Sequence, residues 1–167
     1  MEEKHYDVEA VKSRLGEYRE LIKEIDTQYE RLERLKAKMY SMGAQTLTDM
    51  PKSTNHANDR IANLIEEKEE LESEIGENIE KKRKERKCLE DVIKHLRRSD
   101  ERSVIRIRYF DCASWNDVVD VMFGDRADLL EREEIYLRRV YKLHGQALLG
   151  MAKYIEENDP DRSNIKA

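Results

Sequence analysis

The sequence predicts an all-α protein, with a long antiparallel helical hairpin of the coiled-coil type followed by a small domain of shorter helices. Charged residues make up 41% of the 167 residues and hydrophobic residues only 38%, a balance typical of long solvated helices. The chain has six glycines and two prolines, and both residue types are disfavoured inside helices. Apolar residues recur at three- and four-residue steps, which is the spacing of one helix face.

The first predicted helix runs from about residue 5 to residue 42. Its apolar residues keep heptad spacing over more than four repeats, which is typical of a coiled coil. Gly43 is suited to end the helix, and the segment 43–59, with its proline and many turn-forming residues, predicts a loop. The apolar stripe of this helix consists of Val8, Val11, Leu15, Tyr18, Ile22, Ile25, Tyr29, Leu32 and Met39.

The second predicted helix spans about residues 60–98. Its apolar stripe almost disappears between residues 80 and 87, where basic residues crowd together. On either side of this interruption the three- and four-residue spacing is regular. The stripe consists of Ile61, Leu64, Ile65, Leu71, Ile75, Ile79, Leu89, Val92, Ile93 and Leu96.

Two long helices joined by one loop predict an antiparallel hairpin over residues 1–98. A hairpin with one apolar stripe on each helix buries little apolar surface and leaves Tyr18 and Tyr29 poorly covered. We therefore expect a homodimer in which two hairpins form a four-helix bundle. The residues expected to face the second helix are Leu15, Ile22, Ile25 and Leu32.

Residues 99–156 predict a separate domain of three helices, followed by a flexible tail over residues 157–167. Ser99 or Asp100 can cap the first helix, and Ser114 with Asp117 makes a capping box for the second. Short helix, turn, short helix, turn and basic helix is the order of a helix-turn-helix DNA-binding domain. The expected buried faces are Val104, Ile105, Ile107 and Phe110 in the first helix, Trp115, Val118, Val119 and Met122 in the second, and Val140, Leu143, Ala147, Leu148 and Met151 in the third.

The third helix of this domain, around residues 136–152, carries the candidate site. Opposite its apolar stripe it presents cationic, aromatic and amide side chains. Arginine and lysine can address guanine edges or phosphates, and glutamine can address adenine. A solvated helix face is the alternative interpretation. The candidate DNA-binding residues are Arg138, Arg139, Tyr141, Lys142 and Gln146.

Charge is strongly segregated along the chain. Residues 61–80 carry a net charge of −7 and residues 81–110 a net charge of +7, although the whole chain carries only −5. A nucleic-acid-binding protein needs a basic face rather than a basic average. The basic segment just before the small domain supplies candidate phosphate contacts, or else a solvated helix face. These candidates are Lys81, Lys82, Arg83 and Lys84.

Several short motifs resemble the C-terminal promoter-reading domain, region 4, of bacterial sigma factors. They are Ile107-Arg-Tyr109, Ser114-Trp115, Val118-Val119 and the closing stretch Val140 to Leu148. A long charged helical half joined to such a domain is similar to small phage-encoded regulators of Gram-positive bacteria, of the ArpU and RinA types. The resemblance implies binding to promoter DNA, and it implies RNA polymerase as a possible partner.

The resemblance also implies roles for the candidate residues. Arg138, Tyr141 and Lys142 match base-facing positions, while Arg139 and Gln146 match flanking positions. The chain departs from the family pattern at residues 123–135, where the turn before the third helix is normally short. This insertion either lengthens the turn or extends the third helix backwards from a cap at Asp128.

Enzymatic function is not expected. The four histidines lie on four separate segments, and neither a calcium loop, a glycine-rich phosphate loop nor a nucleophile motif occurs. We therefore expect no catalytic residues, no metal and no cofactor. The unpaired spacing of Cys88 and Cys112, with no apolar run long enough to span a membrane, predicts a cytoplasmic protein. The alternative function is a protein-interaction module whose coiled coil binds a host or phage partner such as RNA polymerase.

Overall fold

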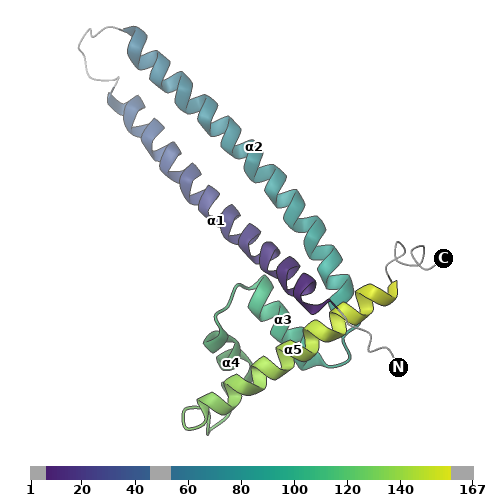
Figure 1. Ribbon diagram of the computed structural model, residues 1–167. Helices are drawn as coiled ribbons and strands as arrows, with labels where there is room; N and C mark the ends of the chain where they lie inside the picture. The colour runs from purple at the N-terminus through teal and green to yellow at the C-terminus, as the bar shows by residue number, and fades with distance from the viewer. Residues whose placement is uncertain (1–6, 46–53, 159–167) are drawn as a thin grey trace, which may run out of the picture. The chain divides into compact units, whose positions relative to one another are not determined.

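The structure is a computed structural model that describes residues 7–45 and 54–158. These residues form helices joined by turns and contain no strand, which confirms the predicted all-α class. The order is α1 (Val8–Gln45), α2 (Thr54–Ile93), α3 (Ser99–Ile105), η1 (Arg106–Phe110), α4 (Trp115–Phe123) and α5 (Glu133–Asn158). Figure 1 labels the α-helices. None of these helices combines the length and the apolar character that a membrane-spanning segment needs.

The described chain forms two compact units. The hairpin unit comprises Glu20–Lys84, and the multi-helix unit comprises the residues before and after it, up to Arg19 and from Glu85 onwards. The multi-helix unit therefore includes the first turns of α1 and the last turns of α2, where Tyr18 packs against Phe110 with 5.1 Å between ring centroids. This grouping differs from the predicted division between residues 98 and 99. As limits of independently folding domains, residues 1–98 and 99–156 stay a prediction.

In the hairpin unit, α1 and α2 pair in antiparallel fashion, as expected (Figure 1). Leu32 packs against Leu71 and Ile75 in a buried apolar cluster. Farther along the pair, the Asn78 amide donates a hydrogen bond of 3.1 Å to Gln28. Because earlier residues of α1 meet later residues of α2, the two helices run in opposite directions.

The apolar stripe of α1 differs from the predicted one in detail. Leu21 is buried while the neighbouring Ile22 is only half-buried, and Tyr29 is 45% exposed. Tyr18, which we expected to be poorly covered, is buried. An α-helix of 3.6 residues per turn drifts against a strict seven-residue repeat, so the buried stripe moves across the predicted positions.

Helix α2 also differs from its predicted limits. It begins six residues before residue 60, at Thr54, because turn-forming residues such as Thr and Asn are also accepted at a helix start. It ends at Ile93 rather than at residue 98, and the chain then turns towards α3. The middle of the predicted loop, residues 46–53, lies outside the described residues, as does most of the predicted tail. The first residues of that tail, up to Asn158, are helical.

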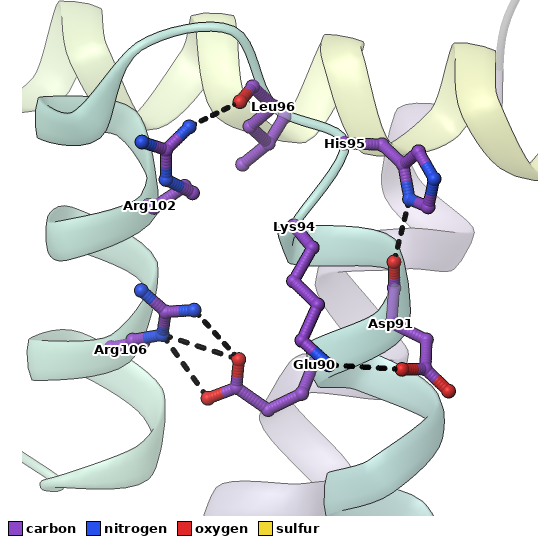
Figure 2. A network of polar contacts seen from close by, with 7 residues as sticks. All are labelled: Glu90, Asp91, Lys94, His95, Leu96, Arg102 and Arg106. Carbon is purple, nitrogen blue, oxygen red and sulfur yellow. Dashed lines mark hydrogen bonds and ion pairs between the residues drawn. The ribbon is translucent and has the colours of Figure 1, made fainter.

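Polar contacts hold the turn between α2 and α3, as Figure 2 shows. The Arg106 guanidinium donates to both carboxylate oxygens of Glu90, with a shortest distance of 2.7 Å from Nη2, and it lowers the pKa of that carboxyl. Arg102 donates to the backbone carbonyl of Leu96, and His95 hydrogen-bonds to the backbone carbonyl of Asp91. The Arg106 contact ties the last turns of α2 to η1, and the Arg102 contact ties the turn to α3.

In the multi-helix unit, α3 and α4 both pack against α5 (Figure 1). The shared core consists of Val104, Val118, Val119, Phe123, Val140 and Leu143. The predicted capping box of α4 is confirmed, because Ser114 accepts from the Asp117 amide and the Asp117 carboxylate accepts from the Ser114 amide. The predicted side-chain cap of α3 is wrong. Arg98 occupies the cap position, so Ser99 and Asp100 already lie in the first helical turn.

The insertion before α5 mainly lengthens the turn. Residues 124–132 form consecutive turns, and α5 begins at Glu133, three residues before Tyr136. Asp128 does not cap α5. Its carboxylate instead accepts a hydrogen bond of 2.8 Å from the Tyr136 hydroxyl, which ties the turn to the helix that follows.

Candidate nucleic-acid interface

Helix α5 has two opposite faces. Its buried face contains every residue that the spacing predicted, together with two more, and it consists of Val140, Leu143, His144, Ala147, Leu148, Met151 and Ala152. The predicted DNA-binding residues all lie on the exposed part of the helix: Arg138, Arg139, Tyr141, Lys142 and Gln146. The helix thus presents a cationic surface while its other side is fixed in the core.

The exposed cations of α5 have weak or partial partners. Arg138 lies 3.6 Å from Glu134, and both side chains are more than 80% exposed. Water and salt screen such a pair strongly, so Arg138 remains available to another anion. The Arg139 guanidinium lies 5.1 Å from the centre of the Phe123 ring, a cation–π contact that ties its side chain to α4.

Trp115, the first residue of α4, joins the exposed face of α5 to the core. Its ring meets Tyr141 edge to face at 5.0 Å and His144 at 4.9 Å between centroids. The Arg108 guanidinium lies over the same ring at 4.5 Å. Trp115 is half-buried and packs against the shared core, in agreement with its predicted part in the buried face. It also fixes the position of Tyr141.

Arg19 and Arg108 are two cations that the sequence analysis did not single out. Arg19, from α1, donates a hydrogen bond of 3.1 Å to the carbonyl oxygen of Cys112, and Arg108, from η1, donates to the carbonyl oxygen of Ala113 at 2.6 Å. The pKa of Arg108 is lowered, first by burial and then by the positive charge of Arg19. Arg19 and Cys112 lie 93 positions apart, so no local pattern could have indicated their contact.

His144 is a buried titratable group that the spacing also did not single out. It is 9% exposed, and its Nε2 lies 3.0 Å from the Tyr109 hydroxyl. Burial lowers the pKa of His144 to about 4, and the nearby charges of Lys12 and Arg108 act in the same direction. The imidazole is therefore neutral at physiological pH and belongs to the core.

The candidate phosphate contacts lie elsewhere, on α2 in the hairpin unit. Lys81, Arg83 and Lys84 are exposed and Lys82 is half-buried. Arg83 forms an ion pair of 3.1 Å with Glu80, one turn before it. The two sets of predicted cations therefore belong to different compact units.

Among the described residues, no three His, Cys, Asp or Glu side chains gather closely enough to hold a metal ion. Cys88 is exposed and Cys112 half-buried, and both thiols are free. Cys112 has a φ of 56°, in the left-handed region that is uncommon for residues other than glycine. It forms the sharp turn between η1 and α4.

The fold and this surface define a class: an all-helical protein in which a paired α1 and α2 accompany a domain with one exposed cationic helix. Residues 49–134 match a family model described as a protein of unknown function (DUF1492), which covers just over half of the chain. The chain therefore belongs to the DUF1492 family. Comparison with curated proteins and with solved structures gives no significant match. The family match ends at the start of α5, before the candidate DNA-binding residues.

Proposed function

We propose that this protein is a DNA-binding transcription regulator, acting on phage or prophage genes, that reads promoter DNA with α5. The observation that carries this proposal is the division of α5 into two faces, with the cations and Gln146 exposed and the apolar residues buried. A helix held by its neighbours along one side and cationic along the other is suited to enter the major groove.

The chemistry of the exposed face favours duplex DNA over a general polyanion. Arg138 and Lys142 are four residues apart, so they project from the same side of the helix with Tyr141 beside them. Arginine and lysine can bond to guanine edges, and Gln146 can form paired hydrogen bonds with adenine. We assign Arg139, whose guanidinium lies 5.1 Å from the centre of the Phe123 ring, to the flanking phosphates.

The start of α5 determines which part of the helix would read bases. Its first turn carries Glu133 and Glu134, whose carboxylates repel phosphate groups. The long turn before it, residues 124–132, also departs from the short turn of the resembled sigma-factor domain. Base contacts are therefore assigned to the second and later turns of α5, from Arg138 to Gln146.

The resemblance to sigma-factor region 4 and to ArpU- and RinA-type regulators supports promoter DNA as the target and RNA polymerase as a neighbour. It also supports phage genes as the regulated genes. The pairing of α1 with α2 supports a homodimer through the hairpin, since readers of this type commonly bind DNA as twofold dimers.

The direct test is a fluorescence-anisotropy titration of the full chain against upstream DNA of the source genome. We expect Arg138→Ala or Lys142→Ala to leave the melting temperature almost unchanged, because exposed substitutions usually alter stability by less than about 0.5 kcal/mol. Each should weaken specific binding by about 1–3 kcal/mol if the side chain reads a base. Arg34→Ala, which removes an exposed cation of α1 in the hairpin unit, is a charge-matched control that should bind as the wild type does. If both α5 variants bind cognate DNA at wild-type strength, α5 is not the reading helix.

A second function is favoured by a different observation, the exposed apolar residues of the hairpin unit. Tyr29 and Ile65 are 45% and 41% exposed, and Tyr40 is 82% exposed. Such residues suit a protein-interaction module that binds RNA polymerase or another partner. In that case the full chain would bind purified polymerase at moderate salt, and Tyr40→Ser would weaken that binding while leaving DNA affinity unchanged.

A further inference from the structure

Two guanidinium groups converge on one turn of the multi-helix unit. Arg19 reaches the carbonyl oxygen of Cys112 and Arg108 reaches that of Ala113, with distances of 3.1 Å and 2.6 Å. These carbonyls belong to consecutive residues, so both positive charges lie at the same turn, close enough for the charge of Arg19 to lower the pKa of Arg108. Helix α1 supplies one of them and η1 the other.

The partners of these guanidiniums do not neutralise them. In the described part of the chain both hydrogen bonds run to backbone carbonyl oxygens, which carry only partial negative charge. Arg14, which also belongs to α1, shows the contrast, because it pairs with the Glu85 carboxylate. The mutual repulsion of Arg19 and Arg108 is part of what lowers the pKa of Arg108. Like charges held together in this way favour the binding of an anion.

Both side chains keep donors for such an anion. A guanidinium has five N–H donors, and the bonds to Cys112 and Ala113 use one nitrogen of each side chain. The Nε of Arg19 is itself buried and has no hydrogen-bond partner among the described residues, so the donors that Arg19 keeps for an anion are those of its Nη atoms. Both arginines are half-buried rather than enclosed, so an anion can approach them.

The location of the pair points to the source of the anion. Arg108 lies over Trp115, and the same ring contacts Tyr141 on the exposed face of α5. An anion at the arginine pair would therefore lie beside the helix that carries the proposed base contacts. On a duplex, the groups that flank a reading helix are the phosphates of the backbone.

We propose that Arg19 and Arg108 together bind one phosphate group of the DNA backbone, beside Tyr141. This inference rests on the proposed function, because it takes duplex DNA as the ligand. It adds α1 to the interface, although α1 lies outside the predicted helix-turn-helix domain of residues 99–156. The paired guanidiniums offer the fork geometry that phosphate oxygens favour.

The test compares the salt dependence of DNA binding in full-length variants. Arg19→Gln and Arg108→Gln should each weaken binding to promoter and scrambled duplexes alike. Each should reduce the slope of log affinity against log salt concentration by about 1, the effect of losing one phosphate contact. Because the two side chains share one phosphate, the double variant should lose little more than either single variant.

Matched controls separate this effect from net charge and from folding. Lys153→Gln removes the same charge from the far part of α5, where Lys153 pairs with Glu157 at 3.9 Å, and it should leave the slope almost unchanged. Arg108→Lys should keep the slope while lowering affinity, since it retains the cation but loses the fork. This variant keeps the inference testable if Arg108→Gln unfolds, which circular dichroism would show.

The outcomes distinguish this inference from the proposed function. If the wild type binds DNA and neither glutamine variant changes the slope, the arginine pair is only a structural cap and the inference is overturned, while the proposed function stands. If the wild type binds no DNA, the proposed function is contradicted, and so is the inference that the arginine pair binds a phosphate of DNA. A titration with inorganic phosphate, followed by the Nε–H signals of the two arginines, would then show whether the pair takes free phosphate instead.

Discussion

At the residue scale, His144 couples the stability of the multi-helix unit to pH. Its folded pKa is about 4, well below the ordinary 6.5, because it is buried beside Tyr109 and Trp115. Between about pH 4 and pH 6.5, His144 is protonated in the unfolded chain but neutral in the folded chain. The contribution of His144 to the free energy of unfolding should therefore be greatest above about pH 6.5 and decrease as the pH drops towards 4. The loss should reach at most about 3 kcal/mol.

Urea unfolding at pH 7 and at pH 5 measures this effect. We expect His144→Leu to lower stability at pH 7, since Tyr109 loses its partner, but to flatten the pH dependence in this window. His95→Gln removes an exposed histidine of the same unit and should keep the wild-type dependence. An equal loss of stability between pH 7 and 5 in the wild type and in His144→Leu would show that His144 is not the group responsible.

Glu134 gives a second prediction at this scale, which concerns DNA affinity. Its pair with Arg138 is exposed on both sides and should add little to stability. In a DNA complex, however, its carboxylate competes with phosphate for Arg138. Glu134→Gln should therefore tighten binding to every duplex several-fold at low salt, without a change in melting temperature. Glu157→Gln, at the other end of α5, serves as the charge-matched control, and an equal gain from both variants would contradict a local role for Glu134.

At the element scale, the hairpin unit contains a polar pair within its apolar seam. Gln28 lies between Ile25 and Leu32 in the sequence, at a spacing that places it on the buried face of α1, and it accepts a hydrogen bond from Asn78. Both side chains are half-buried. A polar pair at such a position can fix the register of two helices at a cost in stability.

Replacing both residues of this pair by leucine tests that role. Asn78→Leu alone should lower the free energy of unfolding by about 1 kcal/mol, because the half-buried Gln28 loses its hydrogen-bond partner. Gln28→Leu combined with Asn78→Leu should instead exceed the single variant in stability, since it exchanges the polar pair for apolar contact. Thermal melting followed by circular dichroism measures both. A double variant that melts no higher than Asn78→Leu would mean that the pair is not part of the seam.

The individual elements also show what could be predicted from the sequence. On α5, three- and four-residue spacing identified the buried apolar residues Val140, Leu143, Ala147, Leu148 and Met151, because one helix face decides burial there. It missed His144, which shares that face but is not apolar. On α1 the same method failed at Tyr29 and Leu21, since a long helix drifts relative to its heptad repeat. The contact between Arg19 and Cys112 could not be predicted, because it depends on how α1 packs against a turn far along the chain.

At the scale of the whole molecule, the net charge of −5 conceals the proposed function. The acidic residues concentrate on residues 61–80 of α2 and around the turn before α5, while cations gather on residues 81–110 and on the exposed face of α5. Overall composition would argue against a nucleic-acid ligand, but the local surfaces argue for one. The fold class could be predicted from composition and spacing. The charge distribution could be interpreted as a binding surface only once the structure divided α5 into a buried apolar face and an exposed cationic face.

Self-association is the last prediction, and it concerns the hairpin unit. The expected cover for Tyr18 is already supplied within the chain, so the case for a dimer now rests on Tyr29, Ile65 and Ile79, which are 45%, 41% and 38% exposed. Ile65 and Ile79 are two heptads apart on α2 and therefore share a face. A second copy of the hairpin would cover this face, and sedimentation at concentrations on the order of tens of micromolar should show a dimer.

Ile65→Lys with Ile79→Lys should shift the protein to monomer and keep its helix content. Leu130→Lys, which changes a 93% exposed residue outside the hairpin unit, should remain dimeric. A wild type that sediments as a monomer over this range would contradict the dimer, and so would a doubly substituted variant that still dimerises.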